Sequence, residues 1–288
     1  MQDNEKKPAL RFKGFTDPWE QRKLGDLCVE FRSGEFISAS DITETGEYPV
    51  FGGNGLRGFT DRFNHDGEYT LIGRQGALCG NVNFAVGKSY FTEHAIAVRA
   101  DKKNQTRFLY YLFSTLDLGQ YSGQSAQPGL AVGNLVELKS TLPDKQEQEK
   151  ISGVLTALDT LITLHQRKYE KLVNIKKSML DKMFPKNGAS VPEIRFKGFT
   201  DLWEQRKLGD ITVELSEYAT QELGLPLLTS SRSGLMYQDE YRDSRTTKST
   251  ETLFSVVPVG TCTYRHMSDD DVFHMNINTL EKGLVSRE

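Results

Sequence analysis

Between residues 48 and 98 the apolar and polar positions alternate in short runs, and glycine-rich stretches separate these runs. This pattern predicts short β-strands joined by tight turns. The strands are expected at YPVF (48–51), YTLIG (69–73), NVNFAV (81–86) and HAIAV (94–98). The stretches GGNGLRG and GRQGALCG supply turns between them, and a last strand is expected to end near Leu142.

Two later segments have the apolar spacing of helices. Phe108, Leu109, Leu112 and Phe113 predict an amphipathic helix over residues 106–116. A glycine- and serine-rich loop, YSGQSAQPG, follows this helix at residues 121–129.

A longer helix is expected to begin after Pro143. Asp144 can cap it, and Glu147, three residues on, is expected to be the reciprocal partner of a capping box. Pro185 and Gly188 stop the helix, which therefore runs for about forty residues, or roughly 60 Å.

A heptad-like apolar stripe follows this helix and predicts a helix–helix interface. Its members are Ile151, Val154, Leu155, Leu158, Leu161, Ile162, Leu172, Ile175 and Met179. The alternative is a core helix of a compact domain, but helices of such domains average only about 11–12 residues. We therefore interpret residues 144–183 as a spacer that pairs with another helix, including the same helix of a second copy.

The chain also contains an internal repeat. RFKGFTDPWEQRKLGD begins at Arg11 and RFKGFTDLWEQRKLGD begins at Arg195. From residues 8–30 to residues 192–214, 18 of 23 positions are identical, and the two copies then diverge. A constant start before a variable body indicates two modules that share a docking frame and bind different targets; the alternative is an ordinary domain duplication with drift.

These patterns predict an α+β fold in three parts. Residues 1–143 form a mixed, β-rich domain, residues 144–187 form the spacer helix, and residues 188–288 form an incomplete second β-rich domain.

Composition narrows the function classes. The chain is 37% hydrophobic and 26% charged, and its net charge is −3, so it lacks the basic excess of a protein that coats nucleic acid nonspecifically. Three separated cysteines predict reduced thiols and no disulfide framework. No apolar run is long enough for a membrane helix and no signal peptide is present, so we expect a cytoplasmic protein that does not bind a membrane.

No motif in the sequence predicts catalysis or a cofactor. FGGNG (51–55) resembles a methyltransferase cofactor loop, but another turn follows it where a helix would be required, so its glycines are expected to form turns. GKS (87–89) lacks the preceding glycine of a P-loop. His266, His274 and the acids at 269–271 are expected to be a solvated loop and no metal site.

Recognition chemistry is the remaining candidate. Arginine and glutamine can bond base edges through two hydrogen bonds, arginine on guanine and glutamine on adenine. Candidate DNA-binding side chains follow the glycine turns and the 121–129 loop; for any single one, a solvated surface residue is the alternative. They are Arg57, Arg62, Arg74, Gln75, Lys88, His94, Gln124 and Gln127.

Three motifs together give the chain a family resemblance. They are WEQRKLGD, which occurs twice, the turn IGRQGALCG, and the helix start LPDKQEQEKISGVLTALDTLI. With these motifs the chain resembles the specificity subunit of Type I restriction–modification systems.

The resemblance implies a non-catalytic, sequence-specific DNA-binding subunit. Each target-recognition domain of that family reads half of a split sequence in double-stranded DNA. Its long helices set the distance between the half-sites and dock modification (methyltransferase) subunits, and through them the restriction motor subunit. The family has two domains and two helices, so this sequence is expected to be truncated within the second target-recognition domain. The alternative function is a coiled-coil interaction protein whose glycine-rich body binds a ligand other than DNA.

Overall fold

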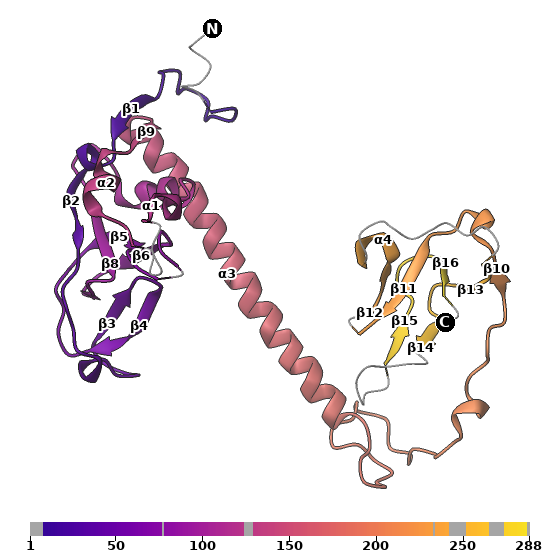
Figure 1. The fold of residues 1–288 in the computed structure, drawn as a ribbon. Coiled ribbons are helices and arrows are strands. Elements are labelled where there is room, and N and C mark those ends of the chain that lie inside the picture. The colour runs from indigo at the N-terminus through magenta and orange to yellow at the C-terminus, as the bar shows by residue number, and fades with distance from the viewer. Residues whose placement is uncertain are drawn as a thin grey trace. The chain divides into compact units, whose positions relative to one another are not determined.

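The computed structural model describes residues 8–76, 78–123, 129–232, 234–241, 252–264 and 274–286. The chain divides into two compact units, Met1–Asp181 and Lys182–Glu288. The fold is α+β, as the sequence predicts: a β-rich body, a long helix and a second β-rich region (Figure 1).

Two sheets form the body of the first unit. The larger sheet has the order β2 (Cys28–Ser33), β8 (Ala95–Ala100), β5 (Glu68–Gly73), β6 (Val82–Val86), and its neighbouring strands are antiparallel. The smaller sheet has the order β4 (Gly55–Thr60), β3 (Tyr48–Gly52), β7 (Tyr90–Phe91). In the smaller sheet β3 and β4 form an antiparallel hairpin, whereas β7 runs parallel to β3.

The main core lies where the larger sheet meets the helices α1 (Thr106–Ser114) and α2 (Val132–Glu137). Ile72, Ile96 and Val98 of the sheet pack there with Phe108, Leu109 and Phe113 of α1. The first strand of the chain closes this core, because β1 (Glu20–Lys23) pairs antiparallel with β9 (Lys139–Leu142). Leu24 and Leu27, which follow β1, are fully buried in the same cluster.

The long helix α3 spans Lys145–Lys182, which confirms that a long helix follows Pro143. Asp144 caps it as predicted, because its Oδ1 accepts the backbone N–H of Glu147 at 2.9 Å. The reciprocal half of the predicted capping box is wrong. Both carboxylate oxygens of Glu147 instead accept hydrogen bonds from Arg11, each at 2.7 Å.

The stripe predicted on α3 divides into two parts. Ile151 packs against the core of the first unit, and Leu155 is half-buried. The other predicted members are 40–54% exposed: Val154, Leu158, Leu161, Ile162, Leu172, Ile175 and Met179. From residue 157 to residue 181 every side chain of α3 is exposed, so this part of the helix leaves the body (Figure 1).

The four predicted strands and the first predicted helix are confirmed as β3, β5, β6, β8 and α1. The FGGNG glycines form a turn as predicted, since Gly52 pairs with Gly55 across a two-residue loop. The strands β1, β2, β4 and β7 and the helix α2 were not predicted; the sequence EQRK of β1, for instance, has no apolar alternation and becomes a strand only by pairing with β9.

The second unit contains a five-stranded sheet in the order β10 (Tyr218–Ala219), β13 (Phe254–Val257), β16 (Gly283–Val285), β11 (Leu227–Ser231), β12 (Gly234–Tyr237). A short helix, α4 (Gln238–Tyr241), follows β12, and β14 (Cys262–Tyr264) pairs with β15 (Met275–Ile277). Buried Asn278 ties the sheet's loops together, because its side-chain amide donates to the carbonyls of Val257 at 2.8 Å and Glu281 at 2.7 Å.

Within the ranges given above, no helix combines the length and the apolar character that crossing a membrane requires. Three cysteine thiols, those of Cys28, Cys79 and Cys262, are free.

Candidate nucleic-acid interface

Three glycine turns of the first unit come together at one end of the β3–β4 hairpin. A Cβ built on Gly53 would lie 2.9 Å from the carbonyl oxygen of His94 and 3.6 Å from the backbone nitrogen of Arg74. A Cβ on Gly73 would collide with the carbonyl oxygen of Gly53. Glycine is therefore required at Gly53 and Gly73 because the backbones touch here. The β3–β4, β5–β6 and β7–β8 connections thus form one compact loop surface.

Arg74 lies at the centre of this loop surface, and its backbone is held on both sides. Its N–H donates to the carbonyl of His94 at 2.8 Å, and its carbonyl accepts the N–H of Leu130 at 2.8 Å. The side chain is half-buried, and its Nη1 donates to the carbonyl of Glu93 at 3.5 Å. A fixed backbone with a half-exposed guanidinium places a forked donor at a defined position.

Gln75, Arg57 and His94 flank Arg74 on the same surface. Gln75 is exposed and forms an isolated β-bridge with Gly129. The side chain of Arg57 lies against Gly52, next to the turn. The ring of His94 is 42% exposed and its Nε2 lies 3.4 Å from Oε1 of Glu93. Four of the predicted DNA-binding residues therefore gather on one surface.

Two other predicted residues lie at the opposite end of the hairpin. Arg62 pairs with Asp41 at 3.2 Å and lies over the ring of Tyr90. Lys88 lies 4.8 Å from the centroid of the Phe63 ring. Arg62 and Lys88 thus belong to a separate cation–aromatic group. The remaining predicted residues, Gln124 and Gln127, lie outside the described residues, as do His266 and the acids at 269–271.

Two polar side chains near the loop surface were missed by the sequence reasoning. Asn83 Nδ2 and Glu93 Oε2 are buried and have no hydrogen-bond partner among the described residues. Asn83 lies beside the turn glycine Gly55, and Glu93 adjoins His94. Buried polar atoms without partners are uncommon, so these two are additional candidates for contact with a ligand. Nothing in the sequence pattern around Asn83 in β6 or around Glu93 between β7 and β8 distinguished them.

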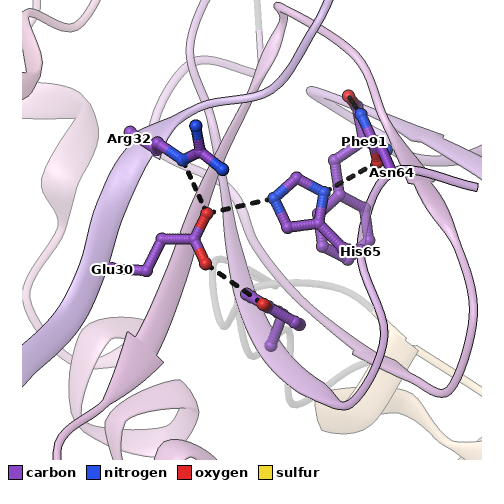
Figure 2. A network of polar contacts seen from close by, with 6 residues as sticks. Glu30, Arg32, Asn64, His65 and Phe91 are labelled. Carbon is purple, nitrogen blue, oxygen red and sulfur yellow. Dashed lines mark hydrogen bonds and ion pairs between the residues drawn. The ribbon is translucent and has the colours of Figure 1, made fainter.

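A polar network joins the two sheets behind this surface (Figure 2). Glu30 of β2 accepts hydrogen bonds from Arg32 at 2.7 Å and from the hydroxyl of Tyr69 at 3.1 Å, and its Oε1 lies 3.1 Å from Nε2 of His65. The His65 side chain is only 3% exposed, and its ring stacks on Phe91 of β7. The network therefore fixes β7, which leads directly into His94, against the larger sheet.

The hydrogen bonds of Asn64 show which atoms face the ring of His65. Asn64 accepts the N–H of Phe91 through Oδ1 and donates to the carbonyl of Phe91 through Nδ2, which fixes the orientation of its amide. His65 Nδ1 lies 2.7 Å from that Oδ1, while Nε2 faces the Glu30 carboxylate. Both ring nitrogens thus face acceptors, so both contacts are hydrogen bonds only when the ring carries two protons.

The electrostatics of Glu30 agree with this arrangement. Burial by itself raises the pKa of the Glu30 carboxyl, but hydrogen bonds from Arg32, His65 and Tyr69 outweigh burial and leave that pKa below its ordinary value. Glu30 is therefore held as a carboxylate at the junction of the two sheets.

The start of α3 is joined to the body by a second buried network. Gln148 is 1% exposed; its Oε1 accepts the N–H of Gln105 at 3.0 Å, and its Nε2 donates to Asn104 and to the carbonyl of Pro143, each at 2.9 Å. About three turns further along α3, the hydroxyl of Tyr111 donates to Asp159 at 2.8 Å. The helix and the loop-bearing body are thereby held in one orientation up to about this turn.

This surface presents hydrogen-bond donors and one ionisable ring, that of His94. Elsewhere in the first unit, the thiol of Cys28 is unsuited to nucleophilic attack. Burial, followed by the charge of Asp101, raises the pKa of Cys28 to about 12. Among the residues that the structure describes, no group of three or more His, Cys, Asp or Glu side chains could hold a metal ion.

Comparison with known proteins identifies a matching domain family and several similar proteins. Residues 16–174 match the Type I restriction modification DNA specificity domain. The chain is 44% identical over 156 residues to the Type I restriction enzyme EcoprrI specificity subunit of Escherichia coli, covering 53% of this chain and 39% of that protein. It is 33% identical over 116 residues to the MjaIX specificity subunit of Methanocaldococcus jannaschii, covering 37% of this chain and 27% of that protein.

A solved structure, the Type-I restriction-modification system S subunit from M. genitalium, is similar at a TM-score of 0.49 and 21% identity, covering 60% of this chain and 46% of that chain. The chain spans less than half the length of each of these relatives. The domain match covers more than half of the chain, including the whole loop surface and most of α3. The chain belongs to the family of Type I restriction modification DNA specificity domains.

Proposed function

We propose that this chain is the DNA-reading subunit of a Type I restriction–modification complex and is itself non-catalytic. Residues 1–143 read one half-site of a bipartite target in double-stranded DNA. Residues 144–187 dock the modification subunits and, through them, the restriction motor subunit. We place this chain in the cytoplasm, together with the DNA that it reads. The single observation that carries the proposal is the family match over residues 16–174.

The loop surface supports a reading role for Arg74, Gln75, Arg57 and His94. Its donors project from turns whose backbones are fixed by mutual contact, so they need no reordering on binding. Arginine and glutamine each bond a base edge through two hydrogen bonds, and one such pair contributes about 1–3 kcal/mol of discrimination. A few such contacts can give selective recognition of bases, whereas nonspecific attraction to phosphates depends on a large positive charge. The net charge of −3 agrees with selective recognition.

The proposal is tested with variants of the loop surface in a complex reconstituted with modification subunits. We expect Arg74→Ala and Gln75→Ala each to lower methylation of the correct target relative to single-base variants of it by about ten- to a hundredfold. Arg62→Ala is the matched control, because Arg62 lies at the other end of the hairpin and pairs with Asp41.

Recovery of the intact complex by gel filtration shows that assembly survives each change. Unchanged target preference in both Arg74→Ala and Gln75→Ala would move the reading surface elsewhere, most directly to residues 121–129. Absence of any target-dependent methylation or DNA shift with the unchanged chain would refute DNA reading and favour a coiled-coil interaction protein.

The exposed part of α3 supports a second proposal, a homodimer through residues 144–183. Seven apolar members of the stripe are 40–54% exposed. Burying the rest of each side chain contributes about half of the roughly 1.5–3 kcal/mol that full burial of an exposed side chain would give. Two copies related by a two-fold axis pair their helices antiparallel, in a contact that closes on itself.

A further inference from the structure

The loop surface carries a single acidic side chain among its hydrogen-bond donors. The three connections that form this surface are residues 53–54, 74–81 and 92–94, and Glu93 is the only Asp or Glu among them. Its side chain is 32% exposed, and its Oε2 is buried without a hydrogen-bond partner among the described residues. A carboxylate oxygen that is buried without a donor carries a desolvation cost. A ligand that brings a donor to Glu93 is therefore favoured.

The backbone of the turn that carries Glu93 is held from several sides. The N–H of Thr92 donates to the carbonyl of Phe51 in β3 at 2.9 Å, and the carbonyl of Thr92 accepts the N–H of Ala95 at 2.9 Å. The carbonyl of Ala95 in turn accepts the N–H of Gly34 at 3.0 Å. The carboxylate therefore projects from a fixed backbone position, and only its side-chain rotations remain to be restricted on binding.

Two arginines lie close to this turn without neutralising the carboxylate. Arg74 reaches the backbone carbonyl of Glu93, with its Nη1 at 3.5 Å. Arg57 and Thr92 approach the same point, because a Cβ built on Gly52 would lie 2.7 Å from Cδ of Arg57 and 3.6 Å from Oγ1 of Thr92. Within the described part of the first unit, neither guanidinium forms an ion pair with Glu93. The carboxylate therefore remains available to accept a hydrogen bond from a ligand.

One acceptor beside several donors indicates the chemistry of the ligand. The phosphate oxygens of DNA only accept hydrogen bonds and carry negative charge, so Glu93 repels them. The major-groove edges of base pairs offer both kinds of group: guanine N7 and O6 are acceptors, whereas the amino groups of cytosine and adenine are donors. Base edges therefore complement Arg74 and Glu93 together, and the DNA backbone does not.

We propose that Glu93 is a specificity-determining residue, whose carboxylate accepts a hydrogen bond from the exocyclic amino group of one cytosine or adenine in the major groove. This assignment rests on the proposed function and deepens it by adding an acceptor to the donors of the loop surface. Where guanine or thymine takes that place, the carboxylate faces a carbonyl oxygen and is repelled. Glu93 thus excludes wrong bases as well as binding the right one.

The test uses the full-length chain assembled with modification subunits and a fluorescent duplex that carries the target this complex methylates. Each cytosine of the duplex is replaced in turn by 2-pyrimidinone and each adenine by purine, so that only the amino group is removed. Affinity is measured by fluorescence anisotropy. We expect one replacement to weaken binding of the unchanged chain through loss of the Glu93 contact, by about ten- to a hundredfold. Its position shows whether the base is cytosine or adenine.

The dependence of this loss on Glu93 is the decisive measurement. In Glu93→Ala and in Glu93→Leu, which is closer in size, the same replacement should change the affinity by less than about threefold. Glu93→Gln keeps an acceptor oxygen and should retain part of the discrimination. Glu44→Gln is the matched control, because Glu44 is exposed and adjoins Thr43, which pairs with Phe59 away from the turn. This control should leave every affinity ratio unchanged.

A purely structural role of Glu93 gives a different result. It predicts that Glu93→Ala and Glu93→Leu weaken binding of all duplexes by one common factor, and that result would overturn the proposal. The proposal also fails if every amino-group replacement has the same effect in these variants as in the unchanged chain. Recovery of the complex by gel filtration shows which of the two variants assembles, and either one suffices for the comparison.

These outcomes are distinguishable from a failure of the proposed function. Retained preference for the target, without any replacement whose effect depends on Glu93, overturns the role of Glu93 alone. An unchanged chain that shows no preference for its target over unrelated duplexes overturns DNA reading and the role of Glu93 together.

Discussion

Glu30 contacts three side chains behind the loop surface. Its carboxylate accepts hydrogen bonds from Arg32 of its own strand and from Tyr69 of β5, and it lies 3.1 Å from the ring of His65, in the segment that precedes β5. Since two of these partners are cations when His65 carries both protons, the carboxylate form of Glu30 is favoured in the folded protein despite its burial. A single carboxyl group thus maintains the relative position of two sheets.

This arrangement predicts acid-sensitive stability of the first unit. Because the pKa of Glu30 is lowered in the folded state, its contribution is present above its ordinary value of 4.5 and is lost as pH falls through the lower folded value. We expect Glu30→Gln to be less stable than the unchanged chain at neutral pH and to lose less stability on acidification. Urea unfolding at several pH values, followed by tryptophan fluorescence and hydrogen exchange in β5, measures the effect.

Glu44→Gln is the control, since Glu44 is exposed and should leave the pH profile unchanged. Parallel pH profiles for Glu30→Gln and the unchanged chain would contradict the role assigned to Glu30.

The role of an individual side chain could be predicted from the sequence only where its neighbours along the chain determine that role. Asp144 was predicted as a helix cap because an N-cap needs only its neighbours along the chain. Glu147 was misassigned because its partner, Arg11, is 136 residues away. Arg62 and Lys88 were grouped with Arg74 because all three adjoin glycine turns, and only the pairing of β3 with β4 shows that they lie at the hairpin's other end.

At the scale of elements, the junction between α3 and the body determines where the helix points. Gln148 occupies this junction and binds the 104–105 turn and the end of β9 simultaneously. Gln148, which belongs to the helix-start motif, therefore connects α3 to the 104–105 turn and to the end of β9. Counting heptads along α3 did not reveal this role. Ile151 likewise belongs to the body's core, so the free apolar stripe begins only after the first two turns.

We expect Gln148→Ala to loosen this junction. The change leaves the buried N–H of Gln105 and the carbonyl of Pro143 without a partner, at a cost of about 2–3 kcal/mol. The decrease should appear in the opening free energy of the Gln105 amide, measured by native-state hydrogen exchange. Gln166→Ala, at an exposed position of the same helix, is the control and should leave that amide unaffected. Equal exchange in the two variants would show that the helix is held elsewhere.

The helices and strands that could be predicted from the sequence were those whose own apolar pattern identifies them. Strands β5 and β8 bury nearly all their side chains and are mostly apolar, and α3 has a long helical apolar period. Strand β1 and the short helix α2 have no such pattern, because pairing with β9 and packing against Gly25 define them. Residues 204–207 demonstrate this dependence directly, since they repeat the sequence EQRK but form no strand.

At the scale of the whole molecule, α3 extends from the domain that we propose to read DNA, and its exposed part is available to pair with a second helix. Residues 157–181 of α3 are exposed, and the stripe reaches Met179 with no member between Ile162 and Leu172. If two copies pair through this stripe, a two-fold axis places two identical reading domains at opposite ends of the helix pair. The target is then an interrupted inverted repeat, and helix length sets the gap between its halves.

Inserting four helix-forming residues after Tyr169 tests this geometry. The insertion lengthens α3 by about 6 Å and rotates its distal part by only about 40°, so the stripe stays nearly in line. Since DNA rises about 3.4 Å per base pair, the preferred gap between half-sites should widen by roughly two base pairs. Methylation of a library of inverted repeats with different gaps measures this change, and a variant with four exposed residues replaced at the same place controls for sequence. An unchanged gap, a target with unrelated halves, or a chain that stays monomeric in light scattering would each contradict the paired-helix arrangement.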